Sequence, residues 1–209
     1  ITLEDSEQNR SQARQRNLDY DTYESVNHFK IGLNWDKSWT DKVILSTYGF
    51  YSFRDFYGKL PFENGGIIDL TRNYFGLGSR LNYKIGKNNL QLAAELLNQS
   101  DQRDRYLNIL GSQGSISFSQ KEKFQNLSFS ILDELKLDKL FFRLSLRYDD
   151  MRLGTDGFSQ DQFYQVVNPS LGVSLEIAPY QYLYANFSTS FETPALSELS
   201  ANPSGAEGF

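Results

Sequence analysis

Apolar residues recur at every second position in several segments of this chain. In the clearest segment, residues 140–149, Leu144 and Leu146 on one side alternate with Arg143 and Arg147 on the other. Successive side chains of a β-strand point to opposite faces, so this period predicts a strand with one apolar face and one polar face. The same pattern recurs in four further segments, at residues 28–35, 75–85, 167–177 and 183–188.

Three further segments, at residues 43–53, 90–96 and 127–135, alternate less cleanly. Residues 90–97 and 132–137 could each form an amphipathic helix by propensity alone. We interpret all three as strands, because each sits beside a tight turn and a strand of the right length. About ten residues is also what a tilted strand needs to cross the apolar band of a membrane. The pattern therefore predicts about eight strands.

The connections between the predicted strands alternate between short and long. Short connections fall at residues 36–42, 86–89, 137–139 and 178–181, whereas the long ones cover residues 1–23, 54–72, 98–123, 150–165 and 191 onward. Outer-membrane barrels have this layout, with short turns on the periplasmic side and long loops outside. The predicted fold class is therefore all-β, an antiparallel transmembrane β-barrel wall of about eight up-and-down strands.

The two predicted faces differ in chemistry as a barrel wall requires. Aromatic residues gather at or beside the short turns, as a girdle at the membrane interface would, and they are Trp35, Trp39, Tyr83, Tyr180 and Tyr182. No Lys or Arg interrupts the five clean apolar faces, where one at the midplane would cost roughly 2–4 kcal/mol. The opposite face accepts charges of both signs, so we expect it to be hydrated, with Arg143 and Arg147 in an ion-pair ladder with carboxylates of neighbouring strands. A lumen wider than that of an eight-stranded barrel would accommodate these charges more easily.

Composition narrows the function classes. The chain of 209 residues has no run of about 18 apolar residues, so a membrane-spanning helix is excluded. It has no cysteine, and its single histidine, His28, is interpreted as a lumen residue without a metal role. The net charge of -5 argues against nucleic acid as a partner. Neither a G-x-S-x-G nor an H-E-x-x-H motif is present, so we expect a protein that is not an enzyme and carries no cofactor.

The two ends of the chain suggest a piece of a longer protein. Residues 1–23 lack the basic and apolar regions of a signal peptide, which indicates either a processed or an internal start. Residues 202–208 read as loop, so we expect the chain to stop inside a loop.

Several segments resemble those of TonB-dependent outer-membrane receptors, particularly ferric-siderophore-type members from Bacteroidetes-like bacteria. The most specific resemblance is the predicted hairpin of residues 168–176 and 183–199, from Asn168-Pro169-Ser170 to Ser197-Glu198-Leu199. Residues 147–149 resemble the "RYD" strand end of that family, and residues 99–106 resemble the start of an extracellular loop.

The resemblance implies a 22-stranded barrel that is closed by an N-terminal plug carrying the TonB box. Residues 1–209 would be one contiguous portion of that barrel domain, without the plug and without the C-terminal strands. The implied location is the outer membrane of a Gram-negative bacterium. The implied partners are its lipid bilayer, a ferric siderophore or other small ligand, and the TonB complex, which would be engaged through the missing plug.

In such a receptor the extracellular loops capture the ligand, so the candidate ligand-binding residues lie in two of the predicted loops. Cationic and aromatic side chains there could hold an anionic, aromatic-rich ligand through charge-assisted hydrogen bonds and stacking. The candidates are Arg54, Phe56, Tyr57, Arg103, Arg105 and Tyr106. The alternative interpretation is that these residues are solvated or fold the loops on themselves.

Two other functions stay open from the sequence. One is a complete, small eight-stranded outer-membrane barrel with a structural, adhesive or enzymatic role. The other is a soluble lipid-carrying calyx, in which the apolar face would lie inside. Pairing between residues 29–35 and 183–189 would close the barrel at eight strands and favour the first of these alternatives over the large receptor.

Overall fold

A computed structural model describes residue 7 and residues 11–156 and 161–194, and within them the chain forms one antiparallel sheet of eight strands. The single described helix with assigned bounds is α2 (Gln15–Asp19). The strands are β1 (Tyr23–Thr40), β2 (Val43–Lys59), β3 (Ile67–Ile85), β4 (Asn88–Ile109), β5 (Ser112–Leu137), β6 (Leu140–Thr155), β7 (Gln162–Ala178) and β8 (Gln181–Ser188). None of the described helices is long and apolar enough to cross a membrane.

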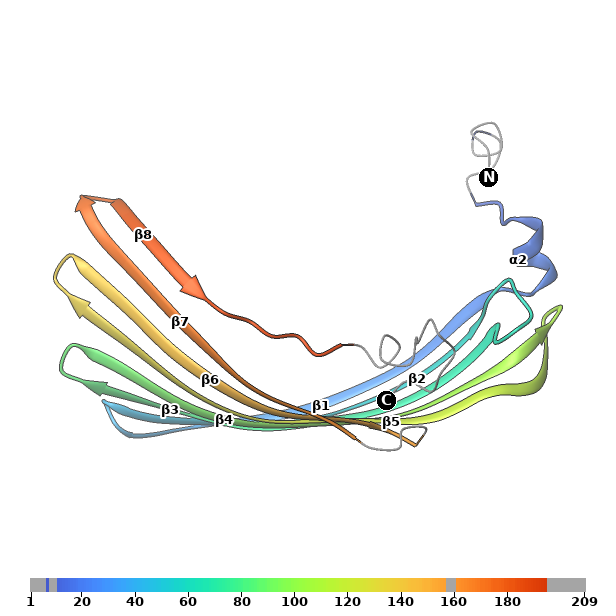
Figure 1. Ribbon diagram of the computed structural model, residues 1–209, viewed down its shortest axis with the longest axis horizontal. Coiled ribbons are helices and arrows are strands. Elements are labelled where there is room, and N and C mark those ends of the chain that lie inside the picture. Colours follow the sequence, from blue (N-terminus) through green and yellow to red (C-terminus); the bar gives the residue numbers. More distant parts are fainter. Residues whose placement is uncertain (1–6, 8–10, 157–160, 195–209) are drawn as a thin grey trace. The chain divides into compact units, whose positions relative to one another are not determined.

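The strand order follows the sequence from β1 to β8, as Figure 1 shows. This order confirms the predicted fold class, an antiparallel wall in which each strand pairs with the next one along the chain. In the described part of the chain, β1 and β8 stand at the two ends of this order and are not hydrogen-bonded neighbours. The pairing of residues 29–35 with 183–189, which an eight-stranded closed barrel needs, is therefore not among the described strand pairs.

The strands are longer than predicted, and three of the predicted long loops are mostly strand. Residues 98–123 form the end of β4 and the start of β5, joined by a tight turn at Leu110 and Gly111, both with positive φ. Residues 54–72 contain a connection only from 60 to 66, and in the third predicted loop residues 150–155 belong to β6 and residues 162–165 to β7. The apolar alternation marks a strand only where one of its faces is apolar. These extensions carry polar residues on both faces, so the pattern did not reveal them.

The chain divides into two compact units. The first comprises Ile1–Phe29, Ser52–Asn73 and Ser100–Glu122, and the second comprises Lys30–Tyr51, Tyr74–Gln99 and Lys123–Phe209. The second unit holds nearly all of the segments with clean alternation together with the extensions of β6 and β7, and the first holds the extensions that join β2 to β3 and β4 to β5.

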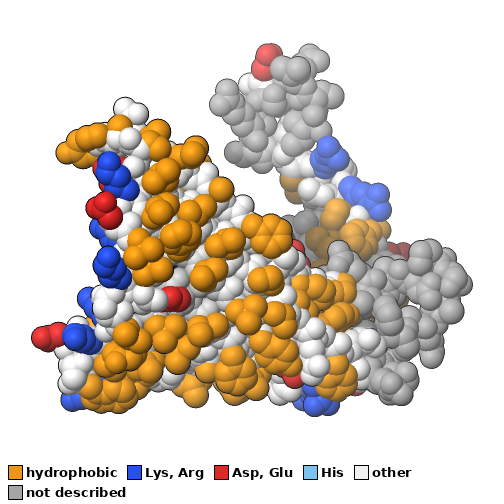
Figure 2. All heavy atoms as spheres, turned by 60° about the vertical axis from the view of Figure 1, so that its left-hand side comes forward, with side chains coloured by type: hydrophobic (Ala, Val, Ile, Leu, Met, Phe, Trp, Pro, Cys, Tyr) orange, Lys and Arg blue, Asp and Glu red, His pale blue; other side chains and the backbone are white. Residues whose placement is uncertain are grey.

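The strand register of the second unit sorts side chains onto two faces. Leu144 of β6 lies opposite Leu171 of β7, which in turn lies opposite Phe187 of β8. Cross-strand partners share a face, and all three side chains are exposed, Phe187 at 62%. Arg143, Gly172 and Asn186 occupy the neighbouring positions and so share the other side. These two sides are called the apolar face and the polar face; Figure 2 shows hydrophobic side chains gathered over one face of the molecule.

The register corrects one member of the predicted aromatic girdle. Tyr182 pairs with Glu176 and therefore lies on the polar face, just before the irregularity between Glu176 and Ala178. Trp35, Trp39 and Tyr180 are exposed large side chains near the short turns, as predicted.

A glycine lets one tyrosine of the polar face reach across a strand. The Tyr48 ring of β2 lies over Gly78 of β3, where a Cβ atom would be 2.5 Å from the nearest ring atom. Its hydroxyl donates a hydrogen bond to Glu95 of β4. Gly78 therefore provides the space that connects β2 directly to β4.

Replacing Gly78 by alanine tests this packing. The added methyl group would collide with the Tyr48 ring, so the Gly78→Ala variant of the intact protein should lose about 1–3 kcal/mol of stability. The measurement is unfolding in urea, followed by the loss of the folded band on unheated gels. Gly172→Ala is the control, because its Cβ would meet Arg143 only at an ordinary 3.7 Å. Equal unfolding midpoints for the two variants would contradict the assigned role.

Candidate functional site

In the first unit, the strand extensions also present two faces of different chemistry. Contacts between Arg72 and Asp101 and between Arg103 and Glu122 define one face. Alternation along β2 and β4 places Arg54, Phe56 and Arg105 on the same face as these pairs. This face is called the arginine face, and it consists of Arg54, Phe56, Arg72, Asp101, Arg103, Arg105 and Glu122. The set called the tyrosine face consists of Asp55, Tyr57, Asp69, Asp104 and Tyr106, at the intervening positions.

Two ion pairs brace the arginine face across β3, β4 and β5. The Arg72 guanidinium donates to both carboxylate oxygens of Asp101, at 2.6–3.0 Å, and Asp101 is only 1% exposed. Arg103 contacts Glu122 at 3.0 Å, and Glu122 is also buried. A buried carboxylate needs such a partner, because an unpaired buried charge is strongly destabilising. These two arginines therefore stabilise the wall.

The other two arginines of this face have no carboxylate partner among the described residues. The Arg54 guanidinium carbon lies 5.8 Å from the centroid of the Phe56 ring, and its Nε is buried without a hydrogen-bond partner in the part of the chain that the structure describes. The Arg105 side chain lies beside Gly65 of the β2–β3 connection. Arg54 and Arg105 therefore leave the arginine face with uncompensated positive charge.

The tyrosine face is acidic. Burial raises the pKa of Asp69 above its usual value, and the nearby charges of Asp55 and Asp104 raise it further. Asp104 accepts hydrogen bonds from Ser119 at 2.6 Å and Gln102 at 2.9 Å. Two carboxylates within electrostatic range of Asp69 disfavour an anionic ligand on this side.

The six predicted ligand-binding residues are thus distributed over both faces. Arg54, Phe56, Arg103 and Arg105 belong to the arginine face, and Arg103 is already engaged by Glu122. Tyr57 and Tyr106 belong to the tyrosine face, where the Tyr57 hydroxyl donates to Gln113 at 3.3 Å. The sequence interpretation treated the two segments as loops, so it could not assign faces, and it missed Arg72 and Asp101 altogether. Strand periodicity carried on through residues 53–59 and 98–109 would have separated the two sets.

A buried asparagine holds the connections of the first unit together. The Asn108 side-chain amide is fully buried and donates to the backbone carbonyls of Tyr20 and Leu60, while its oxygen accepts from the Gly111 N–H. Lys59 adds a second tie, since its ammonium group contacts Asp21 at 2.8 Å and the Gly111 carbonyl at 2.7 Å. These bonds join the segment after α2, the β2–β3 connection and the β4–β5 turn. The connections are therefore pre-organised by named hydrogen bonds.

The polar face of the second unit carries the predicted ion pairs. Arg143 lies 3.7 Å from Glu134 of the neighbouring β5, which confirms its predicted pairing. Arg147 lies 3.8 Å from Glu95 of β4, but its closest carboxylate is Asp149 of its own strand, at 2.8 Å. The predicted ladder is therefore present, with one of its pairs inside a strand.

His28 lies in the first unit, where its Nε2 atom is 2.9 Å from the Ser52 hydroxyl. In the ranges that the structure describes, no group of three or more His, Asp or Glu side chains is arranged to hold a metal ion.

Asp101→Asn tests the bracing role of the buried pair. Replacing the carboxylate by an amide would leave Arg72 without its charged partner, and we expect a loss of about 2–3 kcal/mol in unfolding free energy, since Arg72 keeps partial contact with solvent. Denaturant unfolding of the intact protein is the measurement. The control is Asp36→Asn, at an exposed position of β1. If both variants change the unfolding free energy by the same small amount, the Arg72–Asp101 pair does not stabilise the wall.

The acidic tyrosine face predicts a pH dependence. Because the pKa of Asp69 is raised above 3.8 in the folded protein, the folded state binds more protons in the interval just above pH 3.8. Stability should therefore fall as the pH rises through that interval to the raised pKa. Asp69→Asn should be more stable than the natural protein at pH 7, and the difference should vanish below pH 3.8. Thermal unfolding across this pH range measures it; a constant difference at all pH values would exclude charge repulsion as its cause.

A family model described as "TonB dependent receptor-like, beta-barrel" matches residues 2–209. A search of curated proteins found no significant match to this chain.

Several solved structures share the arrangement of the strands. The ferric citrate transporter FecA in its unliganded form has a TM-score of 0.66 at 18% identity, over 79% of this chain and 27% of that one. The copper transporter OprC has a TM-score of 0.68 at 13% identity, over 85% and 32%. The siderophore receptor PiuA from Acinetobacter baumannii has a TM-score of 0.61 at 10% identity, over 80% and 32%. The chain thus spans about a third or less of the length of each, and at these identities the likeness concerns the fold.

Proposed function

The chain belongs to the TonB-dependent receptor family as part of its β-barrel, and we propose that the intact protein is an outer-membrane receptor that binds and imports a scarce ligand. The family consists of transporters and not enzymes. Transport itself would need the plug and the TonB complex, which we propose as the energy-coupling partners of the intact protein.

We further propose that the apolar face contacts the lipid bilayer of a Gram-negative outer membrane. Its exposed residues include Leu33, Leu77, Leu144 and Leu171, each of which contributes apolar surface without a charged neighbour on the same strand face. Lipid contact accounts for this exposure, because hydrocarbon is the environment in which such side chains are at low free energy. The polar face would then line the interior of the barrel, which argues against a soluble calyx with the reverse arrangement.

The arginine face is the observation that carries the ligand proposal. We propose that the arginine face is turned toward the interior of the receptor, where a ligand would meet its guanidinium groups. Two arginines without a carboxylate partner in the described chain, one of them beside an aromatic ring, suit an anionic ligand with planar groups. The acidic tyrosine face would repel such a ligand.

Ferric siderophores are the leading ligand class. Their iron complexes are anionic or carry oxygen-rich planar groups, which fits Arg54, Arg105 and Phe56. The names of similar structures point the same way, since they include a ferric citrate transporter and a siderophore receptor. A copper transporter has a similar fold as well, so a metal ion of another kind is the main alternative cargo.

A complete small barrel with a structural or adhesive role is the other function weighed from the sequence. The family match over nearly all of the chain and the position of β1 and β8 at opposite ends of the strand order do not support it.

Binding of defined iron complexes to the purified intact receptor tests the proposal. Each charge-assisted hydrogen bond contributes about 1.5–3 kcal/mol, so replacing both Arg54 and Arg105 by alanine should weaken binding of an anionic ferric complex by about a hundredfold or more. The probes are ferric citrate and a ferric tris-catecholate, measured by calorimetry. Iron-limited growth supported by the same complexes reports on import.

The control variant is Lys37→Ala, which removes a cation close to the short turn at residues 41–42 and should leave binding unchanged. Two results would contradict the assignment of the ligand site. If the arginine variant binds as tightly as the natural receptor, the arginine face is not the ligand site. If neither probe binds while a copper salt does, the siderophore class is wrong.

A further inference from the structure

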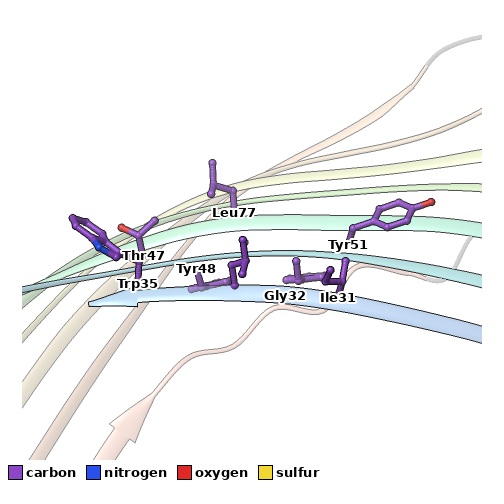
Figure 3. A pocket seen from close by; sticks show the side chains of 10 residues that line it. Ile31, Gly32, Trp35, Thr47, Tyr48, Tyr51 and Leu77 are labelled. Carbon is purple, nitrogen blue, oxygen red and sulfur yellow. The ribbon is translucent and has the colours of Figure 1, made fainter. Parts of the chain in front are cut away.

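The second unit has a hollow on each of its two faces. Figure 3 shows the hollow on the apolar face, with Ile31, Trp35 and Leu77 among its lining residues and no charged residue among them. Gly49 lines it as well, and its missing side chain leaves the space open, since a Cβ atom there would lie 3.6 Å from Leu77. The hollow on the polar face differs in chemistry, because charged and hydroxyl-bearing side chains line it.

The polar face is hollowed where small side chains meet on three strands. Ser46 of β2, Ala93 of β4 and Ser128 of β5 line a depression with a volume of about 250 Å³. Ser128 is only 3% exposed, so a buried polar side chain is part of the lining. At roughly 30 Å³ for each water molecule, the space would hold about eight waters. It therefore suits a small molecule. Larger side chains complete the lining, and they include Asn34, Tyr48, Arg80, Gln91, Glu95 and Arg147.

Contacts within the wall hold one side of this hollow in place. The Tyr48 ring lies over Gly78, and its hydroxyl donates a hydrogen bond to Glu95. Glu95 also lies 3.8 Å from Arg147, whose closest carboxylate is Asp149. The charges of Glu95 and Arg147 are therefore compensated inside the wall, and their side chains are pre-organised before a ligand arrives.

Arg80 supplies the hollow with a positive charge that has no partner. Arg143, Arg147 and Arg152 of the same unit each contact a carboxylate. Among the described residues no such pair includes Arg80, whose side chain is exposed. A guanidinium has five N–H donors and no acceptor, and serine hydroxyls can donate as well. The hollow thus combines one uncompensated cation with several hydrogen-bond donors.

We propose that this hollow is a binding site for a small oxyanion, whose oxygens accept hydrogen bonds from Arg80 and from the serine hydroxyls. Carboxylate and phosphate groups share this chemistry, because a guanidinium matches two oxygens of either group. Arg80 disfavours a cation, and an apolar group would leave the polar lining without hydrogen-bond partners. The site goes beyond the proposed function, since its lining residues all belong to the second unit and the arginine face belongs to the first.

Calorimetric titration of the purified intact receptor tests the site. The receptor carries Arg54→Ala and Arg105→Ala, so that the arginine face does not contribute to binding of the probes. The probes are succinate and inorganic phosphate, and succinamide serves as a neutral molecule of the size of succinate. We expect at least one anion to bind with a Kd of about 1 mM or tighter, and succinamide not to bind. The anion that binds identifies the kind of oxyanion.

Two further substitutions separate the charge from the space. Arg80→Gln removes the charge and keeps an amide donor, and losing a charge-assisted hydrogen bond should weaken anion binding by about tenfold or more. Ala93→Leu keeps Arg80 and fills the hollow, so it should weaken binding as well. The matched control is Arg143→Gln, because Arg143 lies on the polar face, contacts Glu134 and does not line the hollow. It should leave binding unchanged at physiological salt, where distant charges are screened.

Several results would overturn the site. They are failure of both anions to bind, equal binding of succinate and succinamide, and anion binding that Arg80→Gln leaves unchanged or that Arg143→Gln weakens as strongly. The folded band on unheated gels establishes that each variant is folded before it is titrated. None of these results concerns the arginine face, which the ferric complexes probe separately, so loss of this site would leave the proposed function standing.

Discussion

Backbone hydrogen bonding between consecutive strands is the constraint on which the rest of this structure depends. A wall that meets hydrocarbon has no water to satisfy its N–H and C=O groups, so each strand must bond along its length to a neighbour. The order from β1 to β8 meets this need with partners that are adjacent in sequence. Once the register of one hairpin is set, as for Leu144 and Leu171, every side chain of both strands is assigned to a face, because a shift by one residue would exchange the faces.

That assignment has opposite consequences for the two faces of the second unit. On the apolar face, the large side chains are exposed, and the missing side chain of Gly49 creates a hollow between them. On the polar face, charges need partners, and the wall provides them through Arg143 with Glu134 and through Arg147 with Asp149. Glycine has a different effect on the polar face, where the missing side chain of Gly78 leaves room for the Tyr48 ring. Glycine thus leaves a hollow on one face, whereas on the other face its space is filled by a neighbouring side chain.

In the first unit the same ladder continues while the chemistry of both faces changes. Neither face is apolar. The arginine face carries four arginines and the two buried carboxylates that pair with Arg72 and Arg103, whereas the tyrosine face carries Asp55, Asp69 and Asp104 beside its tyrosines. The buried pair of Arg72 and Asp101 fixes the arginine face in place, which leaves Arg54 and Arg105 as charges held by a rigid support. Asn108 extends this rigidity to the connections. A binding surface on such a scaffold loses little conformational entropy when a ligand arrives.

The sequence by itself determined the number of strands, their antiparallel order and the membership of the apolar face, because a period of two with a contrast in polarity is a local signal. It also determined the family, through the segments around residues 168–176 and 99–106, and the structural likeness agrees with it. The ion pair of Arg143 was predictable too, since partners on adjacent strands follow from the hairpin. These features depend on residues close to one another along the chain.

Tertiary structure alone decided the length of the strands and the composition of the candidate site. Where both faces are polar, as in residues 98–109, the periodic signal disappears although the ladder of hydrogen bonds persists, and loops were predicted in place of strands. The six candidate residues are therefore divided between two faces. The structure also pairs Asp101 with Arg72, which lies 29 positions away in the sequence. The reach of Tyr48 over Gly78 to Glu95 spans three strands. Such contacts depend on the register of every strand pair that lies between the two residues. No local pattern in the sequence specifies all of these registers.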